Sequence, residues 1–328
     1  TTGAAALLLA ALLSVVGGAG RAAAQEAELP PTLPNGIAAG DVTPTSVVLW
    51  ARSTALGPVD FTIESSRTDP VTASVPAIEA SRPVTVVVDG LRPDTTYSYS
   101  AITSAGDRMN GEFKTPALDG HRTLRFGVSG DGRGDWLPFQ ALVNAPDRNL
   151  DFFVYLGDTV YADIPSPAVA GAAYSLDEFR LKHAEVHSTR LGRNTLAELR
   201  RSTAIFATID DHDIFNDIAG GAQASTSSRV PESTGFVNDS VRYENGVQAF
   251  REYYPLATEH YGRVGGDGRM DNELCLYRLR IFGSDAALFI LDGRSFRDAP
   301  IAGPDLTSPN DVTRFLEESY TPGRTLLG

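Results

Sequence analysis

The chain has 328 residues and a mass of 35.0 kDa, which is long enough for about two domains, the larger with a substantial core. Its 41 acidic residues outnumber the 28 Lys and Arg residues, so the formal net charge is -13, and no basic run occurs. This argues against a nucleic-acid-binding protein, whose phosphate contacts need a basic surface. The single cysteine, Cys275, excludes an intramolecular disulfide and any multi-cysteine metal site.

We interpret residues 1–24 as the remains of an export signal. The apolar stretch 4–16 is too short for a comfortable membrane span, and small residues at 22–24 provide a cleavage pattern. A buried helix or a segment lying on a lipid surface is the alternative interpretation. Because residue 1 is Thr and no positive segment precedes the apolar stretch, we expect a truncated N-terminus, and a twin-arginine signal stays open. The expected location is the periplasm, the cell surface or the extracellular space.

The segment 25–34 is a Pro-rich linker, and residues 35–118 after it are predicted to be all β. Short runs of β-branched and aromatic residues, bounded by turn residues, predict strands at 45–52, 59–65, 83–91 and 96–103. No helical stretch separates them, so we predict a small β-sandwich. Tyr97 occupies the place of a corner tyrosine that bonds back to the backbone. The segment resembles a fibronectin type III module.

In residues 121–328 the sequence pattern alternates between strands and helices, which predicts an α/β layer with helices packed over a sheet. Apolar runs predict strands at 124–129, 150–157, 202–209 and 286–292. A helix is predicted over 135–145, with Asp135 as its N-cap. Two further helix starts carry capping-box patterns, at Ser175 with Glu178 and at Thr195 with Glu198.

Carboxylates follow the predicted strands of this layer. They are Asp131, Asp158, the pair Asp210 and Asp211, and Asp292. Ligands of open α/β sheets bind at the carboxyl ends of the strands, so we expect separate loops to bring these acids together. Like charges at contact distance cannot all stay ionised, and a bound polyvalent cation removes the conflict. The sequence therefore predicts a metal site.

The donors bear on the identity of the metal. Carboxylate, phenolate and amide oxygens suit iron(III), calcium, manganese or magnesium better than a thiolate metal. Tyr161, three residues after Asp158, can reach the same ion, and a phenolate ligand favours trivalent iron. Two ions bridged by one carboxylate could hold a phosphate ester and generate hydroxide at neutral pH.

The set FGVSGD, LGDTVYAD, TIDDHD with IFND, and LDGRSFRD resembles the alkaline phosphatase D (PhoD-like) branch of the calcineurin-like metallophosphoesterases. The resemblance covers residues 34–328. It implies a β-sandwich followed by a four-layer α/β/β/α metallophosphoesterase domain. It also implies a binuclear site that hydrolyses phosphomonoesters or phosphodiesters with metal-bound hydroxide, holding Fe3+ with Ca2+, with Mn2+ or Zn2+ as alternatives.

The resemblance carries over residue by residue. Asp158 would be the bridging carboxylate and Tyr161 an iron ligand. Asp211 takes the position of the metal-binding asparagine of the wider superfamily, and His212 that of the following histidine, which donates to the phosphoryl oxygens or the leaving group. Asn216 is a further candidate oxygen ligand.

The chain departs from the family pattern in two places. Asp131 stands in a Ser-Gly-Asp sequence where the best-known members have Ser-Cys-Gln, so Asp131 is the expected ligand instead of cysteine. The histidine motifs expected near the C-terminus are absent, and the chain stops where the helix leading to them would begin. We therefore expect a fragment that cannot complete its metal site by itself.

Other residues have competing interpretations. Asp292 with Arg294 and Arg297 is either a phosphate-binding group or a structural salt bridge, and Asp210 is expected to pair with an arginine. His183 and His187 could bridge zinc on one helix face, but a solvated face is favoured. Cys275 is expected to be a buried small hydrophobic residue, and the Gly-rich stretch 264–271 a surface turn.

The sequence thus predicts an exported phosphoesterase with Asp131, Asp158, Tyr161 and Asp211 as metal ligands and His212 assisting. A phospholipase D-like phosphodiesterase is an alternative within the enzyme class. A non-catalytic phosphate- or surface-binding protein on the same scaffold is the alternative from another class. A G-x-x-H or H-x-H segment downstream would favour the enzyme over that binding protein.

Overall fold

The computed structural model describes residues 30–262 and 268–327. The predicted export signal lies outside these residues, as do residues 25–29 of the predicted linker. Across the described ranges, no helix has the length and apolar character that crossing a bilayer requires. Export therefore stays a prediction.

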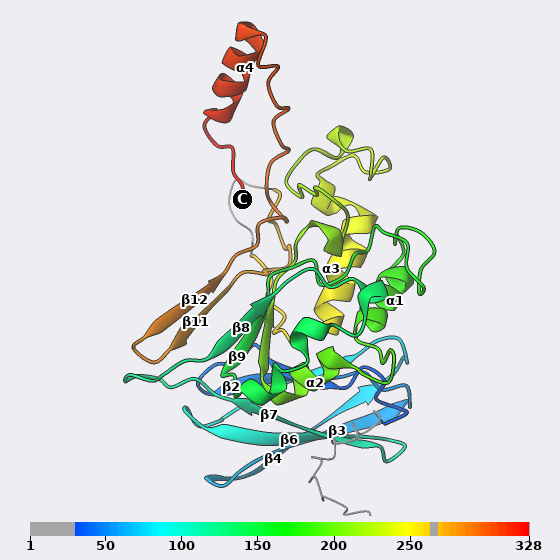
Figure 1. Cartoon of the computed structure of the whole chain (residues 1–328), viewed down its shortest axis with the longest axis vertical. Helices are drawn as coiled ribbons and strands as arrows, with labels where there is room; N and C mark the ends of the chain where they lie inside the picture. Colours follow the sequence, from blue (N-terminus) through cyan, green and yellow to red (C-terminus); the bar gives the residue numbers. More distant parts are fainter. Residues whose placement is uncertain (1–29, 263–267, 328) are drawn as a thin grey trace, which may run out of the picture.

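Two β-sheets form the base of the molecule (Figure 1). The four-stranded sheet has the order β4-β3-β6-β7, with β3 at Gly57–Ser65, β4 at Thr68–Ala77, β6 at Thr96–Thr103 and β7 at Arg108–Lys114. The six-stranded sheet has the order β5-β2-β1-β10-β9-β8. Its members are β1 (Ile37–Gly40), β2 (Ser46–Ala51), β5 (Val84–Asp89), β8 (Phe126–Ser129), β9 (Phe152–Tyr155) and β10 (Ala204–Ala207).

The six-stranded sheet runs across the boundary predicted between residues 118 and 121. Strand β1 pairs in parallel with β10, with Ala39 opposite Ala204 and Gly40 opposite Ile205. A Cβ at Gly40 would lie 2.3 Å from the Ile205 carbonyl oxygen, so this close approach requires glycine. The two segments share one sheet, although their predicted bounds of 35–118 and 121–328 stay predictions.

The central strands are buried on both faces, as their unbroken apolar runs indicate. In β9, Phe152 and Val154 belong to the core between the sheets, whereas Phe153 and Tyr155 belong to the core under the helices. Burying a large apolar side chain stabilises the fold by about 1.5–3 kcal/mol. This strand therefore joins the two cores.

Helices α1 (Leu176–Val186), α2 (Thr195–Ser202) and α3 (Val241–Tyr253) cover one face of the six-stranded sheet. A hairpin of β11 (Arg278–Phe282) and β12 (Ala286–Ile290) contributes Phe282 and Ile290 to the core on the other face. Helix α4 (Pro309–Ser319) projects away from these layers and buries no residue (Figure 1). Short 3-10 helices lie at Gly134–Trp136, Gln140–Leu142, Pro146–Arg148, Asp211–Asp213, Ala224–Thr226 and Val237–Asp239.

Most predicted strands are confirmed. The four N-terminal runs correspond to β2, β3, β5 and β6, and the run 286–292 corresponds to β12. The Tyr97 hydroxyl accepts a hydrogen bond from the Arg92 N–H at 2.8 Å, as the corner-tyrosine interpretation predicts. The fibronectin type III-like character and the four-layer arrangement stay predictions. Strands β1, β4 and β7 had no corresponding prediction.

Three local predictions are wrong. Residues 135–145 form short 3-10 turns instead of a helix, because Pro138 disfavours helical backbone at Leu137, which is extended. The N-cap of α2 is Asn194 and not Thr195, since the Asn194 side chain accepts from the Ala197 N–H at 2.9 Å. Strand β12 pairs with β11 and not within the large sheet. The capping box of Ser175 and Glu178 is confirmed.

Candidate functional site

The neighbouring parallel strands β10, β9 and β8 end at the same edge of the sheet. The loops that follow them carry Asp131, Asp158 and the segment 210–213. Ligand atoms of Asp158, Asp211 and His212 all lie within 4.8 Å of one another. The topology therefore gathers these three predicted site residues at one point.

The backbone of the loop after β9 is restricted by positive φ angles and by close packing against the loop after β10. Gly157 has φ of 94°, and a Cβ there would lie 2.4 Å from the Asp210 backbone nitrogen. Asp158 also adopts a positive φ, 48°. Its carboxylate accepts the His212 backbone N–H at 3.1 Å, which fixes the acid against the loop after β10.

Asp158 is held in a setting that favours a cation. Burial raises the pKa of its carboxyl to about 6, and the charges of Asp211 and Asp210 add to the rise, while the His212 N–H opposes it. Asp211 accepts the backbone N–H groups of His212 at 3.2 Å and Asp217 at 2.7 Å. Crowded carboxylates with oxygen donors fit a hard metal ion, which would relieve their repulsion.

Tyr161 connects Asp131 to this cluster. Its hydroxyl donates to an Asp131 carboxylate oxygen at 2.7 Å and also lies beside Asp158. Burial and the bond to Asp131 raise the pKa of this phenol above its usual value. The Tyr161 ring stacks on the His212 imidazole, with centroids 4.2 Å apart and an angle of 20° between the planes.

His212 is oriented by a residue that the sequence analysis missed. Its Nδ1 lies 2.7 Å from an oxygen of Asp163, whose other oxygen accepts the Asn216 N–H at 2.9 Å. Burial acts to lower the pKa of His212, but the bond and charge of Asp163, with Asp158 and Asp211, raise it overall. Asp163 lies two residues after Tyr161, and that proximity was the available signal.

Asp213 is a second missed residue, and it joins the two loops that carry Asp158 and Asp211. Its fully buried carboxylate accepts the Thr159 N–H at 3.0 Å and the Asp210 N–H at 2.8 Å, as well as the Thr159 hydroxyl. Burial raises the pKa of Asp213 to about 7, although these hydrogen bonds oppose the rise. The sequence does not distinguish Asp213 from its neighbours Asp210 and Asp211. The structure does, because Asp213 is fully buried and binds backbone N–H groups.

Other predicted residues lie around the cluster. The Asn216 side chain donates to Asp217 at 2.6 Å. Arg294 pairs with Asp210, as the sequence predicted for that acid, and approaches Asp211 at 3.5 Å.

Asp292 accepts the backbone N–H groups of Arg294 at 3.0 Å and Ser295 at 2.9 Å, so its carboxylate stabilises the turn after β12. The carbonyl of Arg297 accepts the Gly221 N–H at 3.1 Å.

Three predictions outside the cluster have different outcomes. The solvated helix face expected for His183 and His187 is wrong, because both side chains are fully buried against Tyr253 and Tyr254. Cys275 is buried, as predicted. Residues 264–267 of the predicted surface turn lie outside the described residues, and residues 268–271 form turns and a bend.

Comparison with known proteins agrees with this architecture. The family model "PhoD-like phosphatase" matches residues 128–328, and "PhoD-like phosphatase, N-terminal domain" matches residues 19–117. Alkaline phosphatase D of Bacillus subtilis (strain 168) is 27% identical over 325 residues, which cover 89% of this chain and 51% of the relative. A solved structure titled "Structure of PhoD" has a TM-score of 0.69 at 23% identity, covering 92% of this chain and 59% of that one. The chain spans about half the length of its curated relative, and it belongs to the PhoD-like phosphatase family.

Proposed function

We propose that this chain carries the site of a metal-dependent phosphoester hydrolase. The main observation is that side-chain donor atoms of two proposed ligands, Asp158 and Asp211, and of the proposed proton donor His212 lie within 4.8 Å of one another, at the carboxyl ends of parallel strands. Membership of the PhoD-like phosphatase family supports this function. We also propose, from residues 1–24, that the protein is exported.

The proposed metal ligands are Asp131, Asp158, Tyr161, Asp211 and Asn216. Their carboxylate, phenolate and amide oxygens suit Fe3+ with Ca2+, and Mn2+ or Zn2+ remain alternatives. When bound, such ions supply an activated water molecule and neutralise charge on the phosphoryl group. Bridging by Asp158 is consistent with its place between Asp211 and Tyr161.

The chain's own residues supply the proton chemistry. Asp163 engages Nδ1 of His212 at 2.7 Å, so the other ring nitrogen is left for a substrate oxygen. The net rise in the pKa of His212 favours its protonated form, which suits donation to a leaving alcohol. Tyr161 limits the movement of the imidazole by stacking on it.

Arg294 belongs to the same edge of the site. Its guanidinium pairs with Asp210 and Asp211, so it offsets part of the local negative charge. Phosphate binding by Arg294 and Arg297 remains a proposal, and it requires Arg294 to retain donors free of these carboxylates.

The proposal is tested with metal-reconstituted protein and two substrates, p-nitrophenyl phosphate and bis(p-nitrophenyl) phosphate. We expect Asp158→Asn to lower both the metal content and kcat/KM, the latter by about 100-fold or more, because the acid is shared by the cluster. The matched control is Asp147→Asn, an exposed acid on a 3-10 turn. Unchanged metal content and rate in Asp158→Asn would contradict the proposal, and the ratio of the two wild-type rates separates monoesterase from diesterase.

A further inference from the structure

One wall of the site is a column of four side chains, His212, Tyr161, Arg133 and Trp136. The His212 and Tyr161 rings stack at 4.2 Å, the Arg133 guanidinium carbon lies 5.7 Å from the Tyr161 ring centre, and the same carbon lies 4.8 Å from the Trp136 ring centre. The column therefore leads from the proposed proton donor to a tryptophan, through a cation that contacts both aromatic rings.

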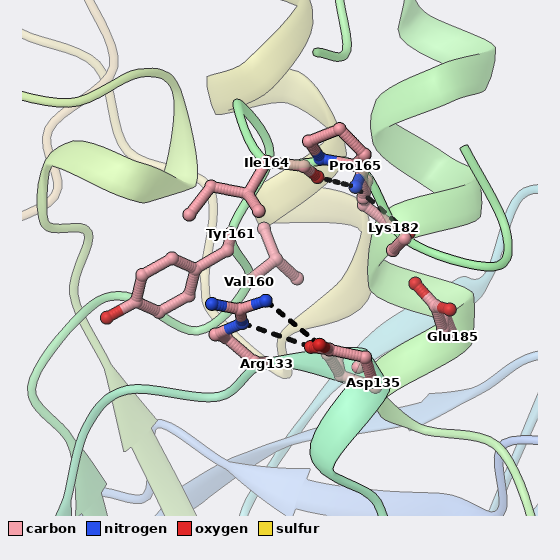
Figure 2. A pocket seen from close by; sticks show the side chains of 11 residues that line it. Arg133, Asp135, Val160, Tyr161, Ile164, Pro165, Lys182 and Glu185 are labelled. Atoms are coloured by element: carbon pink, nitrogen blue, oxygen red, sulfur yellow. Dashed lines mark hydrogen bonds and ion pairs between the residues drawn. The ribbon is translucent and has the colours of Figure 1, made fainter. Parts of the chain in front are cut away.

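Arg133 is held rigidly within this column. Its Nε and Nη2 donate to the two oxygens of Asp135 at 3.0 and 2.9 Å, a bidentate pair (Figure 2). The preceding Gly132 donates its N–H to the Asp158 carbonyl at 2.6 Å, which ties this loop to the metal-ligand loop. The geometry of Arg133 and Trp136 is thus coupled to the backbone of the site.

The pocket beside Arg133 is too small for a substrate group. Its volume is about 10 Å³, room for one water molecule at most. Lys182, at its far side, donates to the Ile164 carbonyl and to the Ser166 hydroxyl at 2.9 Å (Figure 2). This pocket therefore does not accept an ester group, whereas Trp136, at the end of the column, is open to solvent.

Trp136 is 58% exposed, whereas Trp50, the other tryptophan, is fully buried. The contact with Arg133 orients the Trp136 ring, and the part of the ring that Arg133 does not cover is a flat apolar surface exposed to solvent. Such surfaces bind planar aromatic groups, nucleobases among them, by stacking.

We propose that Trp136, oriented by Arg133, is a subsite for a planar aromatic group esterified to the substrate phosphate, of the aryl or nucleobase class. The inference rests on the proposed function, which places the reacting phosphate beside His212 and Tyr161. Trp136 is then a specificity residue that contacts the substrate, and Arg133 is a positioning residue that acts through it.

Binding is tested by tryptophan fluorescence of the metal-reconstituted protein. The probes are adenosine 5′-monophosphate and ribose 5-phosphate, which share the sugar phosphate and differ by the planar base. Because Trp50 is buried, we expect saturable quenching of Trp136 by the nucleotide and none by ribose 5-phosphate. Trp136→Phe should abolish the quenching, and quenching that persists in this variant would overturn the proposal.

Specificity is tested by the ratio of kcat/KM for the two compounds, whose leaving-group oxygens are equivalent. We expect the nucleotide to be favoured about tenfold in the wild type, equally good turnover of both in Trp136→Ala, and a largely retained preference in Trp136→Phe. The control Tyr320→Ala, an 82% exposed aromatic residue after α4, should keep the wild-type ratio.

An unchanged ratio of kcat/KM in Trp136→Ala would overturn the subsite. If both rates fall equally, so that the ratio stays the same, Trp136 only supports the loop. A wild-type protein that turns over neither compound nor p-nitrophenyl phosphate would contradict the proposed function instead. In that case the fluorescence titration still decides the subsite by itself.

Discussion

At the scale of single residues, burial decides what a histidine does in this molecule. His183 and His187 lie on one face of α1, fully buried against aromatic rings. Burial, together with the charge of Arg200, lowers the pKa of His183 to about 3 and that of His187 well below 6.5. In the unfolded chain both would bind protons near pH 6.5. The unfolded state therefore takes up protons first, and stability falls as the pH drops below 6.5.

We predict that His183→Phe makes stability less dependent on pH. Neither ring nitrogen of His183 has a hydrogen-bond partner among the described residues, so phenylalanine loses no bond and keeps the ring contact with Tyr253. Between pH 6.5 and 5, the free energy of unfolding should fall by about 1–2 kcal/mol less than in the wild type, as urea denaturation at each pH would measure.

The matched control is His187→Phe, in which a bond between Nδ1 and the His183 carbonyl, 2.7 Å long, is lost. It should cost about 1 kcal/mol at pH 7 while also flattening the pH dependence. A His183→Phe variant with the same pH slope as the wild type would show that this histidine is protonated in the folded protein.

At the scale of elements, the site depends on how loops leave the ends of β9 and β10. Asp213 joins the two loops through Thr159 and Asp210, and Gly157 allows the backbone of one to approach the other. These residues contribute no ligand in the proposed site. They determine where Asp158 and Asp211 stand, so a change in backbone geometry should act on metal binding as well as on stability.

We predict that Gly157→Ala destabilises the protein more than the strain of a positive φ alone would. Both Gly157, with φ of 94°, and Gly90, with φ of 79°, would strain an alanine, but only at Gly157 does the added Cβ meet backbone, at 2.4 Å. Gly157→Ala should cost about 2–4 kcal/mol and lower the metal content, whereas Gly90→Ala should cost about 1 kcal/mol and leave it unchanged. Equal losses in the two variants, measured by denaturation and metal analysis, would contradict this.

At the scale of the whole molecule, the N-terminal and C-terminal segments are joined by more than a covalent link. Strand β1 completes the large sheet beside β10. The buried carboxylate of Asp41, just after β1, pairs with Arg278 at 3.2 Å and with Arg280, both on β11. On the opposite side, Arg180 of α1 binds Glu252 of α3 at 2.7 Å and Glu79 at 2.9 Å. These contacts indicate a single cooperative unit.

We predict that the chain unfolds in one transition and that Asp41→Asn shifts it as a whole. Losing the charge leaves two arginines without their carboxylate, which should cost about 3–5 kcal/mol. Both signals are recorded in a Trp136→Phe background, so that the fluorescence comes from Trp50 in the N-terminal segment. This fluorescence and the helical circular dichroism, mostly from the C-terminal segment, should show the same lowered midpoint. The exposed Asp69→Asn is the control. A shift confined to one of the two signals would mean that the segments unfold separately.

Several features were predictable from sequence because they depend on neighbouring residues. Apolar runs with turn residues at their ends located β2, β3, β5, β6, β8, β9 and β10. The acids directly after the parallel strands indicated where Asp158 and Asp211 meet, because the carboxyl ends of such strands share one edge. The helix predicted at 135–145 failed at Pro138, where a local backbone restriction outweighed an apolar pattern.

The sequence by itself determined the strand and helix signals, the carboxylate-rich strand ends and the family motifs, since each is carried by residues close together in the chain. Only the tertiary structure decided that β1 pairs with β10, that His183 and His187 are buried, and that Asp163 holds His212. The pairing of β1 with β10 joins residues more than 160 positions apart. Such a choice depends on which surfaces exclude water together, and no local pattern encodes it.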